Sequence, residues 1–155
     1  MRLARAGELL THHKDQAVIT LMRLDDVVDT STPTLAPDMT LGDIVHILAG
    51  HSGNYFAVVD AGGMLHGIVH TTAIRRLIFR TELYRVYTAE QLMEPVSSGR
   101  TIYTTDTMSV IMDKCEHAQV NTLPVLTPQK EFKGFVTKTR ILNYYRQIMK
   151  DFSEE

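Results

Sequence analysis

The chain has 155 residues, 44% of them hydrophobic and 22% charged, which is the composition of a globular protein and not of a disordered segment. Its formal net charge of −2 predicts no general electrostatic attraction to DNA, RNA or anionic lipid, so we expect no nucleic-acid partner. No stretch approaches the ~20 apolar residues that cross a bilayer, and residues 1–8 lack the apolar core of a signal peptide, so we expect this piece to be soluble.

Residues 1–24 are predicted to be a linker that ends in a lead-in helix. The helix is expected from Asp15 to Val28, where it enters the first half of the chain. We interpret Asp25 and Asp26 as a solvated face or a cap of this helix.

The first half then predicts an extended segment, a helix, two strands and a second helix. The extended segment holds Thr34 and Leu35, and Thr40 stands as a cap before the first helix. That helix has apolar residues at helical spacing: Leu41, Ile44, Val45 and Leu48. Strands are expected over Tyr55–Val59 and Leu65–His70, joined by a glycine turn at residues 61–63. The closing helix carries Ile74, Leu77 and Ile78.

The second half predicts the same elements in the same order. A lead-in helix over Thr88 to Met93 precedes an extended segment at Thr101 and Ile102. The next helix carries Met108, Ile111, Met112 and Cys115 behind a Thr107 cap. Strands are expected over Thr122–Leu126 and Phe132–Thr137, and the closing helix carries Ile141, Leu142, Tyr145, Ile148 and Met149. Lone Cys115 is interpreted as a small buried hydrophobe in a reduced, cytosolic setting.

The two halves are an internal repeat with an offset of 67 residues, the spacing between Gly67 and Gly134. Residues 34–79 lie on residues 101–146 without a gap. Nine pairs are identical: Thr34/Thr101, Thr40/Thr107, Ile44/Ile111, Asn54/Asn121, Val58/Val125, Gly67/Gly134, Val69/Val136, Thr72/Thr139 and Ile74/Ile141. One copy is too small to be stable alone, so we predict an α+β fold of two β-α-β-β-α repeats packed sheet to sheet about a pseudo-twofold axis. The shared core is expected to hold Val58, Val69, Val125 and Val136.

Two stretches carry a resemblance to a known family. They read Asn54-Tyr55-Phe56-Ala57-Val58-Val59-Asp60 followed by Gly67-Ile68-Val69, and Asn121-Thr122-Leu123-Pro124-Val125-Leu126 followed by Gly134-Phe135-Val136-Thr137. Each resembles the CBS domain, and the tandem resembles a Bateman module. The resemblance implies one repeat over residues 25–80, a second over residues 88–149, a tail over residues 150–155 and a non-catalytic regulatory role.

The flanking segments resemble the cytosolic C-terminal tail of bacterial CLC chloride channels and transporters. They are Gly7-Glu8-Leu9-Leu10-Thr11-His12-His13-Lys14-Asp15, the run on through Leu21-Met22, and the ending Lys150-Asp151-Phe152-Ser153-Glu154-Glu155. This resemblance implies a module at the cytoplasmic side of the inner membrane. It would regulate the membrane-embedded part of its own parent chain, a chloride channel or proton/chloride exchanger. The alternatives are a ligand-free structural or dimerisation module, and a CBS pair of a different transporter or enzyme.

The CBS resemblance also implies an adenosine nucleotide as a ligand, although no cofactor is required. The family motif Gly-h-h-Thr/Ser-x-x-Asp brings a hydroxyl and helix N-terminal N–H groups to phosphate, and its Asp accepts from the ribose hydroxyls. In the first repeat His70 and Ala73 occupy the hydroxyl and Asp positions, whereas the second repeat keeps Thr137 and has Arg140 in place of Asp. We therefore expect ATP, ADP or AMP at the second motif only. The expected site residues are Thr137, Lys138 and Arg140 near phosphate and ribose, and Tyr103, Asn121 and Thr122 along the base.

Three further expectations concern partners and chemistry. We expect a homodimer, because Leu41, Ile44, Met108 and Ile111 offer apolar helix surface beyond the needs of one small core. We expect neither catalysis nor a metal site, since nucleophile and phosphate-loop motifs are absent and the seven histidines lack ligands at metal spacing. Arg75, Arg76 and Arg80 are interpreted as a solvated helix end, with acidic lipid or a partner domain as the alternative.

Overall fold

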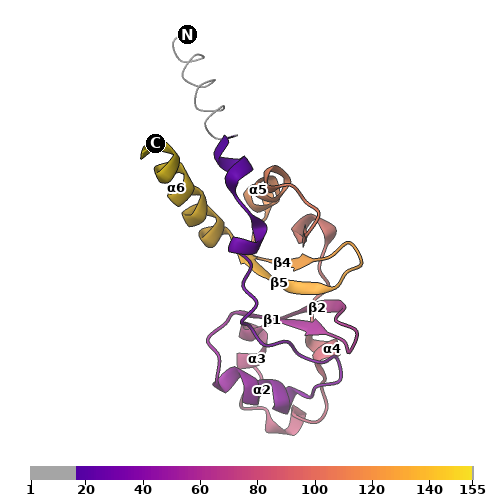
Figure 1. The fold of residues 1–155 in the computed structure, drawn as a ribbon. Helices are drawn as coiled ribbons and strands as arrows, with labels where there is room; N and C mark the ends of the chain where they lie inside the picture. Colours follow the sequence, from indigo (N-terminus) through magenta and orange to yellow (C-terminus); the bar gives the residue numbers. More distant parts are fainter. Residues whose placement is uncertain (1–16, 155) are drawn as a thin grey trace.

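The computed structural model describes residues 17–154, and its helices and strands follow the predicted order (Figure 1). Residues 17–21 are helical. After them come η1 (Leu24–Asp26), α2 (Leu41–Ala49), β1 (Tyr55–Val59), β2 (Leu65–His70), α3 (Thr71–Arg75), η2 (Thr81–Leu83), α4 (Ala89–Leu92), η3 (Ser98–Arg100), β3 (Ile102–Tyr103), α5 (Met108–His117), β4 (Thr122–Leu126), β5 (Phe132–Thr137) and α6 (Lys138–Glu154). The predicted bounds of all four hairpin strands and the α+β class are confirmed.

The two hairpins have the same strand register, displaced by the 67 residues of the sequence repeat. In the first repeat Tyr55 lies opposite His70, and a register shift follows Val58. In the second repeat Thr122 lies opposite Thr137, and the register shift follows Val125. The repeat found in the sequence is therefore a repeat of backbone geometry.

A direct contact between the hairpins locates the axis that relates them. Met64 and Glu131, which are equivalent in the two repeats, pair with each other in an antiparallel bridge. On either side, the Leu65 N–H donates to the Lys130 carbonyl at 3.2 Å and the Phe132 N–H donates to the Gly63 carbonyl at 2.8 Å. A residue that pairs with its own equivalent must lie beside a twofold axis. The predicted pseudo-twofold arrangement is confirmed.

The helices begin where the sequence provides caps. The Thr40 hydroxyl accepts from the Asp43 N–H, and the Asp43 carboxylate accepts from the Thr40 N–H, each at 3.2 Å, which closes a capping box at α2. The Thr107 hydroxyl accepts from the Val110 N–H at 3.3 Å at the start of α5. The Gln91 amide oxygen accepts from the Thr88 N–H at 3.0 Å, and this supports the short α4.

The lead-in helix predicted from Asp15 to Val28 is wrong in its extent. Within the described residues it is broken into residues 17–21 and the 3-10 turn η1. The break lets Met22 and Val27 join the core of the second repeat. Beside it, the Tyr144 hydroxyl of α6 donates to the Asp26 carboxylate at 2.5 Å. Residues 15 and 16 of the prediction lie outside the described residues.

Each hairpin has one face toward its own helices and one face toward the other hairpin. Phe56, Val58 and Val69 pack under α2 and α3 of the first repeat. Val125 and Val136 pack in the corresponding core of the second repeat. The placement of Val58, Val69, Val125 and Val136 in a core shared between the repeats is therefore wrong. Because side chains alternate along a strand, it is their neighbours Ala57, Ile68 and Phe135 that meet between the sheets.

The two lead-in segments cross over, so that each pairs with the hairpin of the other repeat. Asp29, in the segment before α2 of the first repeat, exchanges two backbone hydrogen bonds with Phe135, at 2.7 and 3.0 Å. Glu94, in the segment before β3 of the second repeat, exchanges two with Ile68, at 2.8 and 2.9 Å. Since Ile68 and Phe135 are repeat equivalents, the crossover obeys the same pseudo-twofold symmetry. It joins the two repeats into one unit.

Glycine makes this crossover possible. A Cβ on Gly67 would lie 2.7 Å from the Glu94 carbonyl oxygen, and one on Gly134 would lie 2.5 Å from the Asp29 carbonyl oxygen. Gly134 also has a φ of +149°, a conformation that side chains disfavour. Both repeats therefore have glycine at this position because another segment of backbone passes too close for a side chain.

The dimer surface expected from the sequence is not available. Leu41, Ile44 and Ile111 are completely buried within the single chain, and Met108 is half-buried. The most buried residues of each helix stripe pack into the core of their own repeat. Among residues 17–154, no helix combines the length and the apolar character needed to cross a membrane.

The close approach of backbone to the two glycines predicts that alanine at either position destabilises the protein, and by a different amount at each. Gly134→Ala should lower the free energy of unfolding by about 1–3 kcal/mol, because the added methyl group overlaps backbone that cannot move away freely. Gly67→Ala should lower the free energy of unfolding by a smaller amount in the same range. The added methyl group also overlaps backbone there, but Gly67 does not have a φ that side chains disfavour.

Urea denaturation would measure both, with Gly99→Ala as the matched control, because no atom lies within 4 Å of a Cβ at Gly99. Alanine at Gly67 and Gly134 that is as stable as alanine at Gly99 would contradict the crossover packing.

Candidate functional site

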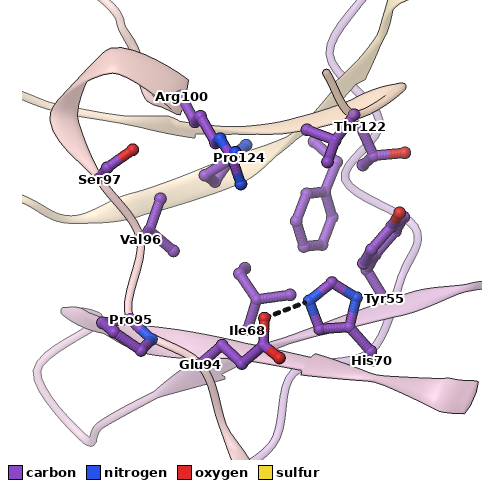
Figure 2. Close-up of a pocket in the computed structure, with 12 residues that line it drawn as sticks. Tyr55, Ile68, His70, Glu94, Pro95, Val96, Ser97, Arg100, Thr122 and Pro124 are labelled. Atoms are coloured by element: carbon purple, nitrogen blue, oxygen red, sulfur yellow. Dashed lines mark ion pairs between the residues drawn. The ribbon is translucent and has the colours of Figure 1, made fainter. Parts of the chain in front are cut away.

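A pocket of about 310 Å³ opens between the two hairpins (Figure 2). The first repeat, the second repeat and the crossing lead-in segment all contribute side chains to it. They are Tyr55, Ile68, His70, Glu94, Pro95, Val96, Ser97, Arg100, Val120, Thr122, Pro124 and Phe135. Two pairs in this set, Tyr55/Thr122 and Ile68/Phe135, are repeat equivalents, so the pocket lies against the pseudo-twofold axis.

The interior of the pocket is apolar and rigid. Ile68 and Phe135, which are 8% and 5% exposed, belong to the cluster between the sheets. Val96 and Pro95 follow directly after the crossover bridge at Glu94, and Figure 2 shows them beside the cavity. Such a slot between two hydrogen-bonded hairpins suits a flat, poorly hydrated ring.

Polar groups stand at the rim. The His70 ring meets the Tyr55 ring edge-on, with 4.9 Å between centroids, and its Nε2 lies 3.0 Å from the Glu94 carboxylate. Arg100 stands on the side of the second hairpin, with Ser97 close to it along the turn η3 (Figure 2). Arg100 supplies a permanent positive charge with several donors, which suits a phosphate.

The residues of the second motif are placed elsewhere. Thr137 is the repeat equivalent of His70, so the axis carries it to the opposite side of the molecule's centre. Its hydroxyl accepts from the Arg140 N–H at 3.1 Å and so caps α6. The Lys138 ammonium donates to the Ala118 carbonyl, so it already has a hydrogen-bond partner within the protein.

Arg140 lies near the crossing lead-in segment. Hydrogen bonds from the Ser31 hydroxyl, and then from its N–H, hold the pKa of Asp29 below its usual value, and the charge of Arg140 adds a smaller lowering. Arg140 therefore has an acidic neighbour that a phosphate would have to approach.

The three residues expected along the base are divided between the two ends of β4. Thr122, at its start, lines the pocket. Asn121 is tied to α6, since its backbone carbonyl accepts from the Lys138 N–H at 2.8 Å and its side chain from the Thr139 hydroxyl at 3.3 Å. Tyr103 pairs with Leu126 at the far end of β4, about 13 Å along the strand from Thr122. The Lys114 ammonium lies 4.9 Å from the centre of the Tyr103 ring.

Sequence reasoning missed most of the pocket. The sequence predicts nucleotide at the second motif only, so His70 is outside the expected site, and so is every residue from Glu94 to Arg100. Gly67 was the available signal, because an identical glycine in both strands indicates that another backbone passes close by. The backbone that passes Gly67 is that of Glu94, and it brings the following residues to the pocket.

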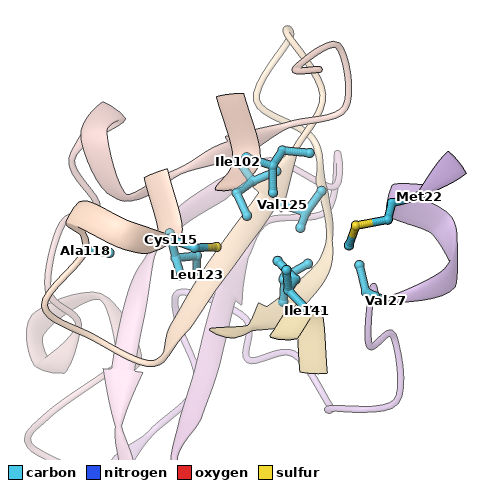
Figure 3. Packing of buried hydrophobic residues seen from close by; sticks show 10 residues of the cluster. Met22, Val27, Ile102, Cys115, Ala118, Leu123, Val125 and Ile141 are labelled. Carbon is cyan, nitrogen blue, oxygen red and sulfur yellow. The ribbon is translucent and has the colours of Figure 1, made fainter. Parts of the chain in front are cut away.

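Two other candidate groups have ordinary surroundings. Cys115 is buried, and that burial raises the pKa of its thiol above the ordinary value. It packs with Leu123, Ala118 and Ile141 in the core of the second repeat, as the sequence predicted (Figure 3). Within residues 17–154, no three His, Cys, Asp or Glu side chains gather in a way that could hold a metal ion.

Comparison with known proteins identifies the first repeat. Residues 24–80 match the CBS domain family. No curated protein matches the sequence of the chain.

Solved structures match both repeats. CbpB in complex with c-di-AMP is 18% identical, with a TM-score of 0.72 over 92% of this chain and 96% of that one. CBSX2 in complex with AMP is 17% identical, with a TM-score of 0.62 over 79% of this chain and 93% of that one. The CBS domain of a membrane protein from Sphaerobacter thermophilus is 20% identical, with a TM-score of 0.68 over 90% of this chain and 96% of that one. Residues 24–80 thus match a CBS domain, and across both repeats the chain has the fold of CBS-domain proteins.

Proposed function

We propose that the chain is a regulatory CBS pair that binds an adenine nucleotide in the pocket between its repeats. The observation that carries this proposal is the composition of the pocket: a buried apolar slot around Ile68 and Phe135 with Arg100 at its rim. An adenine base would pack in the apolar slot, and the Arg100 guanidinium would donate hydrogen bonds to a phosphate. Two proteins of the same fold are known in complex with c-di-AMP and with AMP, which supports this class of ligand.

Binding would regulate by fixing how the two repeats are held together. A ligand in the slot would touch β2 of the first repeat, β4 of the second and the crossing segment at once. Any change in the angle between the hairpins would break some of these contacts, so the ligand favours one arrangement over the others. A host domain attached to the chain would sense that preference.

The arginine at the rim also predicts that the pocket binds nucleotides with a phosphate group more tightly than a nucleoside. Arg100 is exposed and, in the described contacts, makes only a backbone hydrogen bond, from its N–H to the Ser97 carbonyl. A charge-assisted hydrogen bond from its guanidinium contributes about 1.5–3 kcal/mol, or roughly tenfold or more in affinity. AMP, ADP and ATP should therefore bind more tightly than adenosine.

The second motif provides the competing location for the same ligand. There Thr137, Lys138 and Arg140 would meet the phosphates and ribose, with Tyr103, Asn121 and Thr122 along the base. Thr137 keeps a hydroxyl proton to donate, since it only accepts in the cap of α6. We favour the pocket at His70 because Lys138 is already bonded to the protein and Arg140 has Asp29 as a neighbour.

Calorimetry with adenosine, AMP, ADP, ATP and c-di-AMP distinguishes the two locations. Arg100→Ala should weaken nucleotide binding about tenfold and leave adenosine unchanged, because it removes only a phosphate contact. Arg140→Ala and Thr137→Ala, the matched variants of the other cleft, should bind as wild type does.

The opposite pattern, a loss with Thr137→Ala or Arg140→Ala and none with Arg100→Ala, would place the ligand at the second motif. An absence of heat with all five ligands would contradict the nucleotide proposal and favour a ligand-free scaffold that joins or dimerises its host.

For the host, we propose the cytoplasmic side of a membrane chloride channel or proton/chloride exchanger, as the flanking segments suggest. Half of those segments, residues 7–16 and residue 155, lies outside the described residues. A homodimer also remains part of this proposal, although it must use surface other than Leu41, Ile44 and Ile111.

The host proposal predicts where the native protein is found. Antibody raised against the chain should detect a larger polypeptide in the membrane fraction of source cells, one that detergent releases and alkaline carbonate does not. Detection in the supernatant after carbonate extraction would contradict an integral membrane host.

A further inference from the structure

The segment after α3 exposes a basic and aromatic surface, which we call the tip patch. Its members are Arg75, Arg76, Phe79, Arg80, Arg85 and Val86. Phe79 is 92% exposed and Val86 is 58% exposed. In Figure 1 the helices α2 and α3 of the first repeat form the end of the molecule away from α6, and the tip patch belongs to that end. None of its residues lines the pocket between the repeats.

The backbone of this segment sorts its side chains into an inner and an outer side. The Leu77 N–H donates to the Ile74 carbonyl at 2.9 Å, and the Arg80 N–H donates to the Leu77 carbonyl at 3.0 Å. Bonds between residues three apart make a 3-10 turn, in which residues three apart face the same way. Ile74 and Leu77 face the core. Arg76 and Phe79 consequently share the outer side.

The segment is held firmly against α2. The Tyr84 hydroxyl donates to the Ile78 carbonyl. The Gly42 N–H donates to the Tyr84 carbonyl at 3.1 Å, and the Leu41 N–H donates to the Tyr87 carbonyl at 2.9 Å. Phe79 is therefore presented to solvent by an anchored turn.

The tip patch has a local positive charge that the net charge of −2 conceals. Residues 75–87 contain four arginines and one acid, Glu82, which is paired with Arg80 at 2.6 Å. The nearby Asp43 carboxylate is engaged in the capping box of α2. Arg75, Arg76 and Arg85 are exposed, and Arg76 lies on the same side of the 3-10 turn as the exposed Phe79.

We infer that the tip patch docks on the surface of an anionic lipid bilayer. Phe79 would enter the interfacial region, and the arginines would contact lipid phosphates on either side of it. Charge decides against a second copy of the chain as the occupant, since a twofold contact through this surface would bring arginines against arginines. The inference does not depend on the nucleotide pocket.

Vesicle co-sedimentation of the full 155-residue chain tests the inference. The chain should pellet with vesicles that contain phosphatidylglycerol and not with pure phosphatidylcholine, and added salt should release it. Phe79→Ala should weaken the binding about tenfold through lost apolar contact. Arg76→Gln should weaken it about fivefold.

Leu142→Ala and Arg146→Gln are the matched controls, because both residues are exposed on α6 of the second repeat. They should bind the anionic vesicles as the wild type does, and thermal melting should show all variants folded. The inference is overturned if the chain ignores anionic vesicles, or if Phe79→Ala and Leu142→Ala bind equally. It is also overturned if sedimentation velocity without lipid shows a dimer that Phe79→Ala dissociates.

Discussion

The whole structure depends on two short backbone crossings. Each repeat receives a bridging residue from the segment that leads into the other, Asp29 at Phe135 and Glu94 at Ile68. A hairpin of two strands is barely stable alone in water, and each small repeat buries limited apolar surface. The crossing adds backbone hydrogen bonds to each hairpin from outside the repeat. Folding of one repeat therefore needs the chain that belongs to the other.

The pocket is a consequence of the same crossing. After Glu94 pairs with Ile68, the chain continues as Pro95, Val96 and Ser97 along the gap between the hairpins. The pocket consequently has walls from both repeats and from their connection. A ligand at this position would contact both repeats and the connection between them.

The sequence predicts the elements of the fold well, but it does not predict which residues line the pocket between the repeats. Short apolar runs bounded by turn residues located all four hairpin strands, because both signals depend only on neighbours within one segment. Val58 and Val69 were assigned to the wrong core, because an apolar run does not show which face of the strand meets the other sheet. The pocket was missed because His70, Arg100 and Thr122 are far apart in the chain. A family motif directed attention to Thr137, while the crossing that assembles the pocket has no motif of its own.

Native-state hydrogen exchange at the crossing measures the central claim most directly. The amides of Asp29, Ile68, Glu94 and Phe135 each donate one of the four crossing hydrogen bonds. If the two repeats form one cooperative unit, all four amides should exchange with the same free energy, equal to that of global unfolding. Exchange of Asp29 and Phe135 at a free energy well below that of Ile68 and Glu94, or of all four well below global unfolding, would show that the repeats fold independently and would contradict the account.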